Sequence, residues 1–147
     1  NGESEFDAVF ESKEGRLIGE AEGKDNKPIN IDKLRQLAMN IHEDLERDEV
    51  NGPAKPVLFG NPYRLQPINS RLEPFTTKCI SAATTSSTAL VFTPDLFLIA
   101  KYLKDKRDTR YATKCRKTIL TSVGHVKFPA LPDETYSDSE QPKSDNT

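Results

Sequence analysis

Three side chains near the amino terminus have the types and the spacing needed to hydrolyse a phosphodiester bond: Asp7, Glu22 and Lys24. Mg²⁺ is a hard ion that binds one or two carboxylates and keeps water in its remaining positions. A lysine beside such an ion can orient the attacking water or stabilise the charge that develops on the phosphate. These residues therefore predict metal-assisted hydrolysis if the fold brings them to one place.

The segments that carry these residues are predicted to form a β-hairpin. In EFDAVFES, at 5–12, Phe6, Ala8 and Phe10 alternate with Asp7, Val9 and Glu11, which is the period of a strand. A second strand, LIGEAEGK at 17–24, follows a turn in which Gly15 can take a positive φ angle. The hairpin would place the two parts of the candidate site on neighbouring strands.

A turn centred on Glu14 and Gly15 predicts that Asp7 lies directly opposite Glu22. Two facing carboxylates about 5 Å apart repel each other, and a divalent cation would relieve that repulsion. The alternative is an amphipathic hairpin whose acids simply point into water. The predicted polar face carries Asp7, Glu20, Glu22 and Lys24, and the predicted apolar face carries Phe6, Ala8, Phe10, Leu17 and Ala21.

The rest of the chain alternates between predicted helices and strands. A leucine stripe predicts a helix over 30–50 with Asn30 as its N-cap, and Thr93-Pro94-Asp95 begins another that runs to about Leu103. This order predicts an α/β (α+β) fold, with a central mixed β-sheet and an N-terminal β-hairpin flanked by helices. Residues 1–132 are predicted to form one domain, and 133–147 a disordered acidic tail. The remaining predicted elements are strands at 55–61, 89–92 and 125–128 and helices at 71–84 and 111–122.

The order and spacing of these motifs resemble the PD-(D/E)xK nuclease superfamily, which has the restriction-endonuclease-like fold. In that family an acid on one strand is followed by a hairpin, by Asp/Glu-x-Lys on the next strand, and by a helix. Asp7 matches the first acid, and Glu22-Gly23-Lys24 matches the tripeptide. The helix from Asn30 follows in order, so the resemblance covers about residues 5–60. Members also carry an N-terminal helix with a further acid, so the chain is expected to be an N-terminally incomplete part of a larger protein.

The resemblance implies a Mg²⁺-dependent deoxyribonuclease, in which Mn²⁺ would substitute for Mg²⁺ and DNA is the partner. Asp7 and Glu22 would hold the metal, with the Gly23 carbonyl as a further ligand. Lys24 would act on the attacking water. The alternative function is an inactive nuclease-fold module that binds nucleic acid or a protein partner. The intact set of two acids and a lysine favours the enzyme.

Two further polar residues are candidates for a supporting role or for a second metal. Glu20 is predicted on the same face as the other acids, although a solvated acid is the preferred interpretation. Gln36 matches the glutamine of the Gln-x-x-x-Tyr motif of RecB-like members, but Asn40 stands in place of the tyrosine. Helical spacing sets Gln36 and Asn40 nearly opposite the apolar stripe, which favours a solvated polar face.

The charge distribution favours an anionic partner for the second half of the chain. Residues 1–50 hold 7 Lys/Arg and 14 Asp/Glu, a net of −7, whereas residues 51–132 hold 13 and 4, a net of +9. Arginine suits phosphate binding because its planar fork matches the phosphate oxygens. A solvated charged helix remains the alternative for the last helix. The candidate nucleic-acid-binding residues are Arg64, Arg71, Arg110, Lys114 and Lys117.

Composition also bounds the location of the protein. No apolar run approaches the ~20 residues of a membrane span, and the chain has no secretory leader pattern. Cys79 and Cys115 lack the spacing of metal ligands and indicate buried thiols in a reducing compartment. A cytoplasmic protein without membrane contact is therefore expected, and a homodimer is compatible with these observations.

Overall fold

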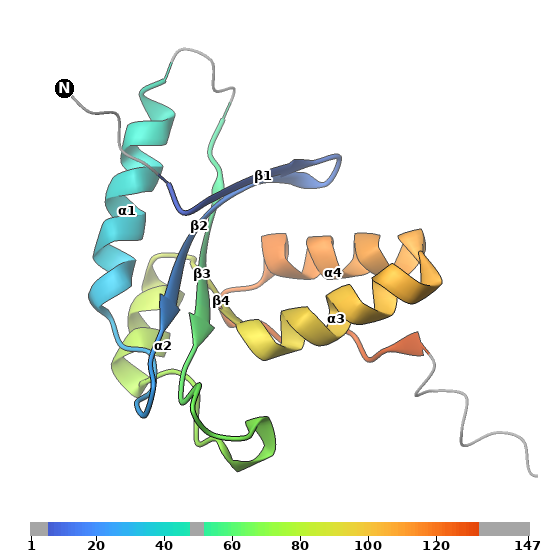
Figure 1. Cartoon of the computed structure of the whole chain (residues 1–147). Helices are drawn as coiled ribbons and strands as arrows, with labels where there is room; N and C mark the ends of the chain where they lie inside the picture. Colours follow the sequence, from blue (N-terminus) through green and yellow to red (C-terminus); the bar gives the residue numbers. More distant parts are fainter. Residues whose placement is uncertain (1–5, 48–51, 133–147) are drawn as a thin grey trace, which may run out of the picture.

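The computed structural model describes residues 6–47 and 52–132, which form three layers: a five-stranded sheet with two helices on each face (Figure 1). This arrangement confirms the predicted mixed α+β class. The described strands are β1 (Ala8–Ser12), β2 (Gly15–Gly23), β3 (Lys55–Asn61), β4 (Ala89–Phe92) and β5 (Gly124–His125). The described helices are α1 (Asp32–Leu45), α2 (Thr77–Thr85), α3 (Thr93–Lys106) and α4 (Thr109–Thr121), with a short 3₁₀ helix, η1 (Ile68–Ser70), between β3 and α2.

The strands lie in the sheet in chain order. β1 and β2 form the antiparallel hairpin, and β2, β3, β4 and β5 run parallel to one another. Parallel neighbours need a crossover connection, which α1, α2 and the α3–α4 pair supply. The carboxyl ends of the four parallel strands therefore meet at one edge of the sheet. In open α/β sheets this edge is where ligands bind.

Alternate residues of the strands face the two helical layers. Glu20, Leu58 and Leu90 lie in one row across β2, β3 and β4, facing α1 and α2, and Val57 and Ala89 form a neighbouring row that faces α3 and α4. The apolar members of both rows are fully buried. Helix residues that complete the two cores are Leu34, Leu37, Cys79 and Ala83 on one face, and Leu96 and Ile119 on the other.

Several predicted boundaries are corrected by local hydrogen bonds. The helix predicted over 71–84 begins only at Thr77, where the Thr76 hydroxyl accepts from the Cys79 N–H at 3.1 Å as the N-cap. Pro74 disfavours helix in the residue before it, so the chain ahead of the cap stays in a loop. At the start of α1, Ile31 rather than Asn30 takes the N-cap position, and the Asn30 side chain accepts from the Asp32 N–H.

Some predictions lie outside the described residues or are confirmed within them. The helix predicted over 30–50 is too long, because α1 ends at Leu45 with Glu46 as its C-cap, and the acidic tail predicted at 133–147 lies outside the described residues. Cys79 and Cys115 are both buried free thiols, as predicted. Within 6–47 and 52–132, no helix is long and apolar enough to cross a membrane.

Candidate functional site

The hairpin register differs from the predicted one by two residues. The observed pairs include Val9 with Ile18 and Phe10 with Leu17, so the two-residue turn is Lys13-Glu14. The observed register joins apolar residues across the strands, whereas the predicted one would have set Val9 against a glutamate. Because the shift is by two residues, the faces of the strands keep their identity. The prediction that Asp7 faces Glu22 is therefore wrong, and the Asp7 carboxyl contacts Glu20 instead.

Glu22 and Lys24 stand where β2 reaches the carboxyl edge of the sheet. The Lys24 Nζ lies 3.1 Å from Glu22 Oε1, and the Glu22 side chain is only 10% exposed. The second oxygen, Oε2, is buried and has no hydrogen-bond partner among the described residues. Burial raises the pKa of the neighbouring Cys79 thiol to about 11, and the charge of Glu22 adds to that shift. A buried carboxylate oxygen without a donor is costly, so a partner that supplies positive charge would stabilise it.

Arg64 lies directly on the glycine of the tripeptide. A Cβ atom added to Gly23 would lie 3.2 Å from Arg64 Nη1, so the absence of a side chain lets the guanidinium approach the strand. The Arg64 N–H donates to the Lys24 carbonyl at 2.9 Å, and its side chain pairs with Asp25. The structure thus brings the predicted Arg64 beside Glu22-Gly23-Lys24.

Arg71 has a different role in the same loop. Its Nη1 donates to Asn61 Oδ1 at 2.8 Å and to the Pro62 carbonyl at 3.1 Å, and its Nε donates to the Gln66 carbonyl at 3.0 Å. These bonds hold the loop that follows β3 against the sheet edge. Arg71 therefore braces the loop that presents Arg64, a role that its sequence position alone does not indicate.

Glu20 is buried, contrary to the prediction that it is solvated. It is 3% exposed and lies in the apolar row between the sheet and α1. The Asn40 side chain donates to Glu20 Oε1, and Lys33 Nζ lies 3.9 Å from Oε2. Burial, with the neighbouring Asp7 carboxylate, raises the pKa of Glu20. The Asn40 amide therefore compensates a carboxylate that is placed in the core.

The prediction that Gln36 and Asn40 share a solvated face of α1 is wrong for Asn40. Asn40 is fully buried, and its Oδ1 accepts from the exposed Gln36 amide at 3.0 Å. The buried stripe of α1 is Leu34, Leu37, Asn40 and Asp44. Sequence reasoning missed it because two polar residues occupy stripe positions and an apolar one, Leu45, is 48% exposed. The available signal was that Asn40 and Asp44 repeat at the spacing of the leucines.

Asp7 lies at the rim of this network. It is exposed, and its Oδ2 accepts from the Ala21 N–H at 3.0 Å, a bond that holds the pKa of Asp7 below its ordinary value. Phe6 next to it packs with the α1-side core, and Arg47 stacks on its ring, so the prediction that Phe6 faces the other layer is wrong. Asp7 lies just before β1, which begins at Ala8.

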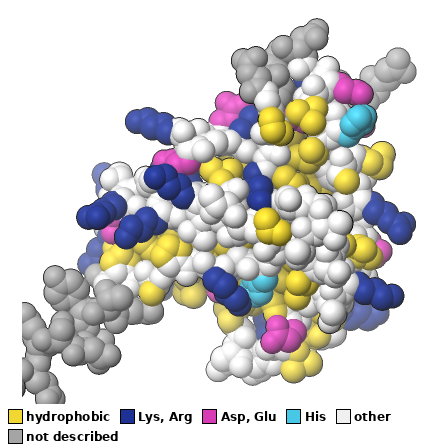
Figure 2. Space-filling model, turned by 180° about the vertical axis from the view of Figure 1, so that it is seen from behind, with side chains coloured by type: hydrophobic (Ala, Val, Ile, Leu, Met, Phe, Trp, Pro, Cys, Tyr) yellow, Lys and Arg dark blue, Asp and Glu magenta, His cyan; other side chains and the backbone are white. Residues whose placement is uncertain are grey.

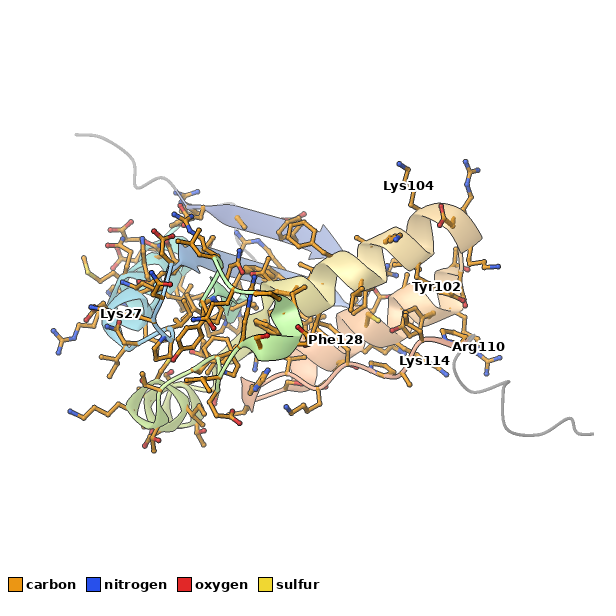
Figure 3. All side chains as sticks on the ribbon, turned by 60° about the horizontal axis from the view of Figure 1, so that its bottom comes forward. Lys27, Tyr102, Lys104, Arg110, Lys114 and Phe128 are labelled. Atoms are coloured by element: carbon orange, nitrogen blue, oxygen red, sulfur yellow. The ribbon has the colours of Figure 1, made fainter. Side chains whose placement is uncertain are left out.

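The basic residues predicted on the last helix lie apart from this edge. Arg110, Lys114 and Lys117 are exposed on α4. Figure 3 shows Arg110 and Lys114 at the far end of the α3–α4 pair, at the opposite side of the molecule from Lys27, which follows the Glu22-Gly23-Lys24 segment. The structure does not bring these three cations together with Glu22 and Lys24.

The donor atoms at this edge suit Mg²⁺. Glu22 Oε2 is a hard oxygen without a hydrogen-bond partner among the described residues, which fits an ion held by one carboxylate and water. Within the described part of the chain, no three His, Cys, Asp or Glu side chains already converge as a metal-binding group. Comparison with protein-family models, curated proteins and solved structures found no significant match to this chain.

Proposed function

We propose that this chain is a metal-dependent nuclease domain that hydrolyses phosphodiester bonds of DNA. The observation that carries the proposal is the buried Oε2 of Glu22, unpartnered among the described residues, with Lys24 Nζ at its other oxygen. Both residues lie at the carboxyl edge of a mostly parallel sheet, beside an arginine suited to phosphate. The resemblance of Glu22-Gly23-Lys24 to the PD-(D/E)xK tripeptide supports the same chemistry.

In this proposal each group has a separate task. Glu22 would hold Mg²⁺, with the Gly23 carbonyl oxygen as a further ligand, and Asp7, whose carboxyl contacts Glu20 rather than Glu22, is not assigned to the same ion. The bound ion would lower the pKa of water and polarise the phosphate. Lys24 orients the water or stabilises the charge that develops on the phosphate. Arg64 binds a neighbouring phosphate. Glu20 is held by Asn40 and fixes the position of the Asp7 carboxyl.

Cleavage of supercoiled plasmid and of linear DNA with Mg²⁺ or Mn²⁺ tests the proposal. The matched proteins are the unmodified chain, Glu22→Gln, Lys24→Ala and a control, Lys27→Ala, whose exposed side chain lies just outside the tripeptide. The unmodified chain and the control should cut, and the two site variants should lose about 100-fold or more in rate. Equal behaviour of all four proteins would refute the assignment of these residues.

Metal binding can be measured without activity. At a Mg²⁺ concentration ten times the Kd, binding to the folded state adds about 1.4 kcal/mol of stability. For a domain of this size that is a rise in Tm of roughly 3–5 °C. Glu22→Gln should abolish the rise, whereas Lys27→Ala should keep it. A rise that persists in Glu22→Gln would place the metal elsewhere.

The second candidate is a module with this fold that binds DNA without cutting it. It is favoured by one observation: no three ligand side chains converge among residues 6–47 and 52–132. Such a module would bind labelled DNA in EDTA, would show no cleavage with either metal, and would show no Tm rise with Mg²⁺. The same set of proteins therefore separates the two functions.

A further inference from the structure

The first strand forms an open edge of the sheet. β1 pairs with β2 on one side, and no strand among residues 6–47 and 52–132 lies on its other side. All of its residues after Ala8 are exposed, and Phe10 is 59% exposed. Proteins commonly block such edges with a proline or a bulge. β1 has no proline, and its register with β2 is continuous from Ala8 to Ser12, so the edge can accept a further strand.

The hairpin turn determines which backbone groups face the open edge. β1 and β2 are joined by a two-residue turn, and Ser12 pairs with Gly15 next to it. In such a hairpin the pair beside the turn is hydrogen-bonded, and the following pairs alternate between non-bonded and bonded. Ser12 and every second residue before it therefore bond to β2. Val9 and Glu11 direct their N–H and C=O groups to the open edge, so a further strand would bond to these two residues.

The charges of β1 select one register for pairing with a second copy of this chain. Two β1 strands can pair antiparallel around a two-fold axis at Val9, Phe10 or Glu11, because each centre sets outward groups against outward groups. An axis at Val9 sets Glu11 opposite the partner's Asp7, and an axis at Glu11 sets two glutamates opposite each other. Like charges directly opposite destabilise a strand pair. An axis at Phe10 avoids both conflicts and sets Asp7 opposite the partner's Lys13. The pairs in this register are Asp7–Lys13, Ala8–Ser12, Val9–Glu11 and Phe10–Phe10.

The same register brings the two Phe10 rings together on the two-fold axis. Phe10 forms part of the wall of a hollow of about 260 Å³ between the hairpin and the α3–α4 layer, with Leu17, Phe59 and Leu96 among its other walls. The two Phe10 residues form a non-hydrogen-bonded pair, in which side chains approach most closely. Aromatic side chains paired across strands stabilise a sheet. The contact would therefore cover an aromatic ring that is mostly exposed in one chain alone.

Antiparallel pairing also keeps the most basic part of the chain away from its copy. Segment 93–128, which contains α3 and α4, carries nine Lys/Arg and three Asp/Glu, a net of nine minus three, or +6. Figure 2 shows Lys and Arg side chains gathered at the α3–α4 end of the molecule. In Figure 1 the hairpin turn and the α3–α4 pair extend from the sheet in the same direction. Because the two hairpins of a pair point in opposite directions, the two basic ends point away from each other.

We propose that two copies of this chain form a homodimer through β1, in the antiparallel register centred on Phe10. Val9 and Glu11 of each copy exchange backbone hydrogen bonds with the other copy, and the two five-stranded sheets become one continuous sheet. The two-fold axis reverses the direction of β2, so the two Glu22–Lys24 pairs lie at opposite edges of the joined sheet. The interface does not depend on the proposed nuclease function.

Analytical ultracentrifugation from about 1 to 100 μM tests the dimer, because this range brackets a micromolar Kd. The unmodified chain should dimerise within it. Val9→Pro removes the N–H that faces the open edge but none that bonds to β2, and it should raise the Kd about tenfold or more, since two hydrogen bonds are lost per dimer. Val9→Thr keeps the N–H and is the matched control, with an unchanged Kd. A chain that stays monomeric at the highest concentration, or equal Kd values for the two variants, would overturn the proposal.

A cysteine pair tests the register independently. Phe10→Cys would place two thiols in a non-hydrogen-bonded pair with Cα atoms about 4.5 Å apart, within the range of a disulfide. Ser12→Cys, on the same strand, would place them about 14 Å apart, because Ser12 pairs with the partner's Ala8. With diamide as the oxidant, Phe10→Cys should form a covalent dimer and Ser12→Cys should not. The native Cys79 and Cys115 are buried and serve as the background in the unmodified chain. Equal cross-linking of the two variants, or none in Phe10→Cys, would refute this register.

Discussion

The buried pair of Glu20 and Asn40 gives the sharpest prediction for stability. Asn40→Leu replaces the amide by an apolar side chain of similar size and removes the hydrogen bond to a carboxylate that is 3% exposed. Hydrogen bonds to charged groups contribute about 1.5–3 kcal/mol, and a carboxylate left buried without its donor loses at least that much. The expected loss is about 2 kcal/mol, or roughly 4–8 °C in Tm.

The double variant Glu20→Leu/Asn40→Leu tests the reasoning. A leucine in place of Glu20 would continue the row of Leu58 and Leu90, and replacing both polar partners by apolar groups is close to neutral. The double variant should therefore recover to within about 1 kcal/mol of the unmodified chain. Urea unfolding of the four proteins in the cycle measures the coupling. If Asn40→Leu is neutral, or if the double variant is as unstable as the single one, the carboxylate does not depend on Asn40.

Two further predictions concern packing and charge. Asp44→Asn should lower the free energy of unfolding by about 3 kcal/mol near neutral pH, because the carboxylate of Asp44 is fully buried and its Oδ2 accepts from Arg16 Nη1 at 2.5 Å. Arg16 holds the pKa of Asp44 below 3.8, so the stabilisation is present above that pH and is lost as the pH falls through the lowered pKa. The free energies of unfolding of Asp44→Asn and the unmodified chain should therefore converge in acid. A difference that stays constant with pH would contradict this reasoning. Gly60→Ala should cost about 1–3 kcal/mol of stability, because its Cβ would lie 2.9 Å from Phe75 Cε1. The control is Gly23→Ala, whose Cβ would lie 3.2 Å from the end of the flexible Arg64 side chain. This control should unfold at nearly the same urea concentration as the unmodified chain.

The fold class could be predicted from the sequence because its signals are local. Alternation at 5–12 and 17–24 indicates a hairpin, and the Thr93-Pro94-Asp95 stretch indicates the start of α3, which begins at Thr93. These patterns depend on residues within a few positions of each other. Local order predicts only that Arg64 follows a strand, and its position beside the tripeptide depends on the pairing of β3 with β2.

The details of the site could not be predicted because they depend on partners far along the chain. The hairpin register is fixed by cross-strand apolar pairs and by Glu14, which bonds to Arg116 of α4 at 2.8 Å. The burial of Glu20 depends on Asn40, twenty residues later, and no local pattern distinguishes a buried glutamate from a solvated one. Arg71 looks like any exposed arginine until its carbonyl partners are placed around it.

The two polar pairs under α1 determine how that helix can sit on the sheet. Arg16 and Glu20 of β2 meet Asp44 and Asn40 of α1 in reverse order, as expected for a helix that returns antiparallel to its strand. Sliding α1 by one turn, about 5.4 Å, would separate both pairs at once and leave two carboxylates buried without donors. An all-leucine interface would tolerate such a slip at small cost. The two polar pairs therefore stabilise one axial position of α1 relative to β2. That position also determines how far the end of β2 extends beyond α1.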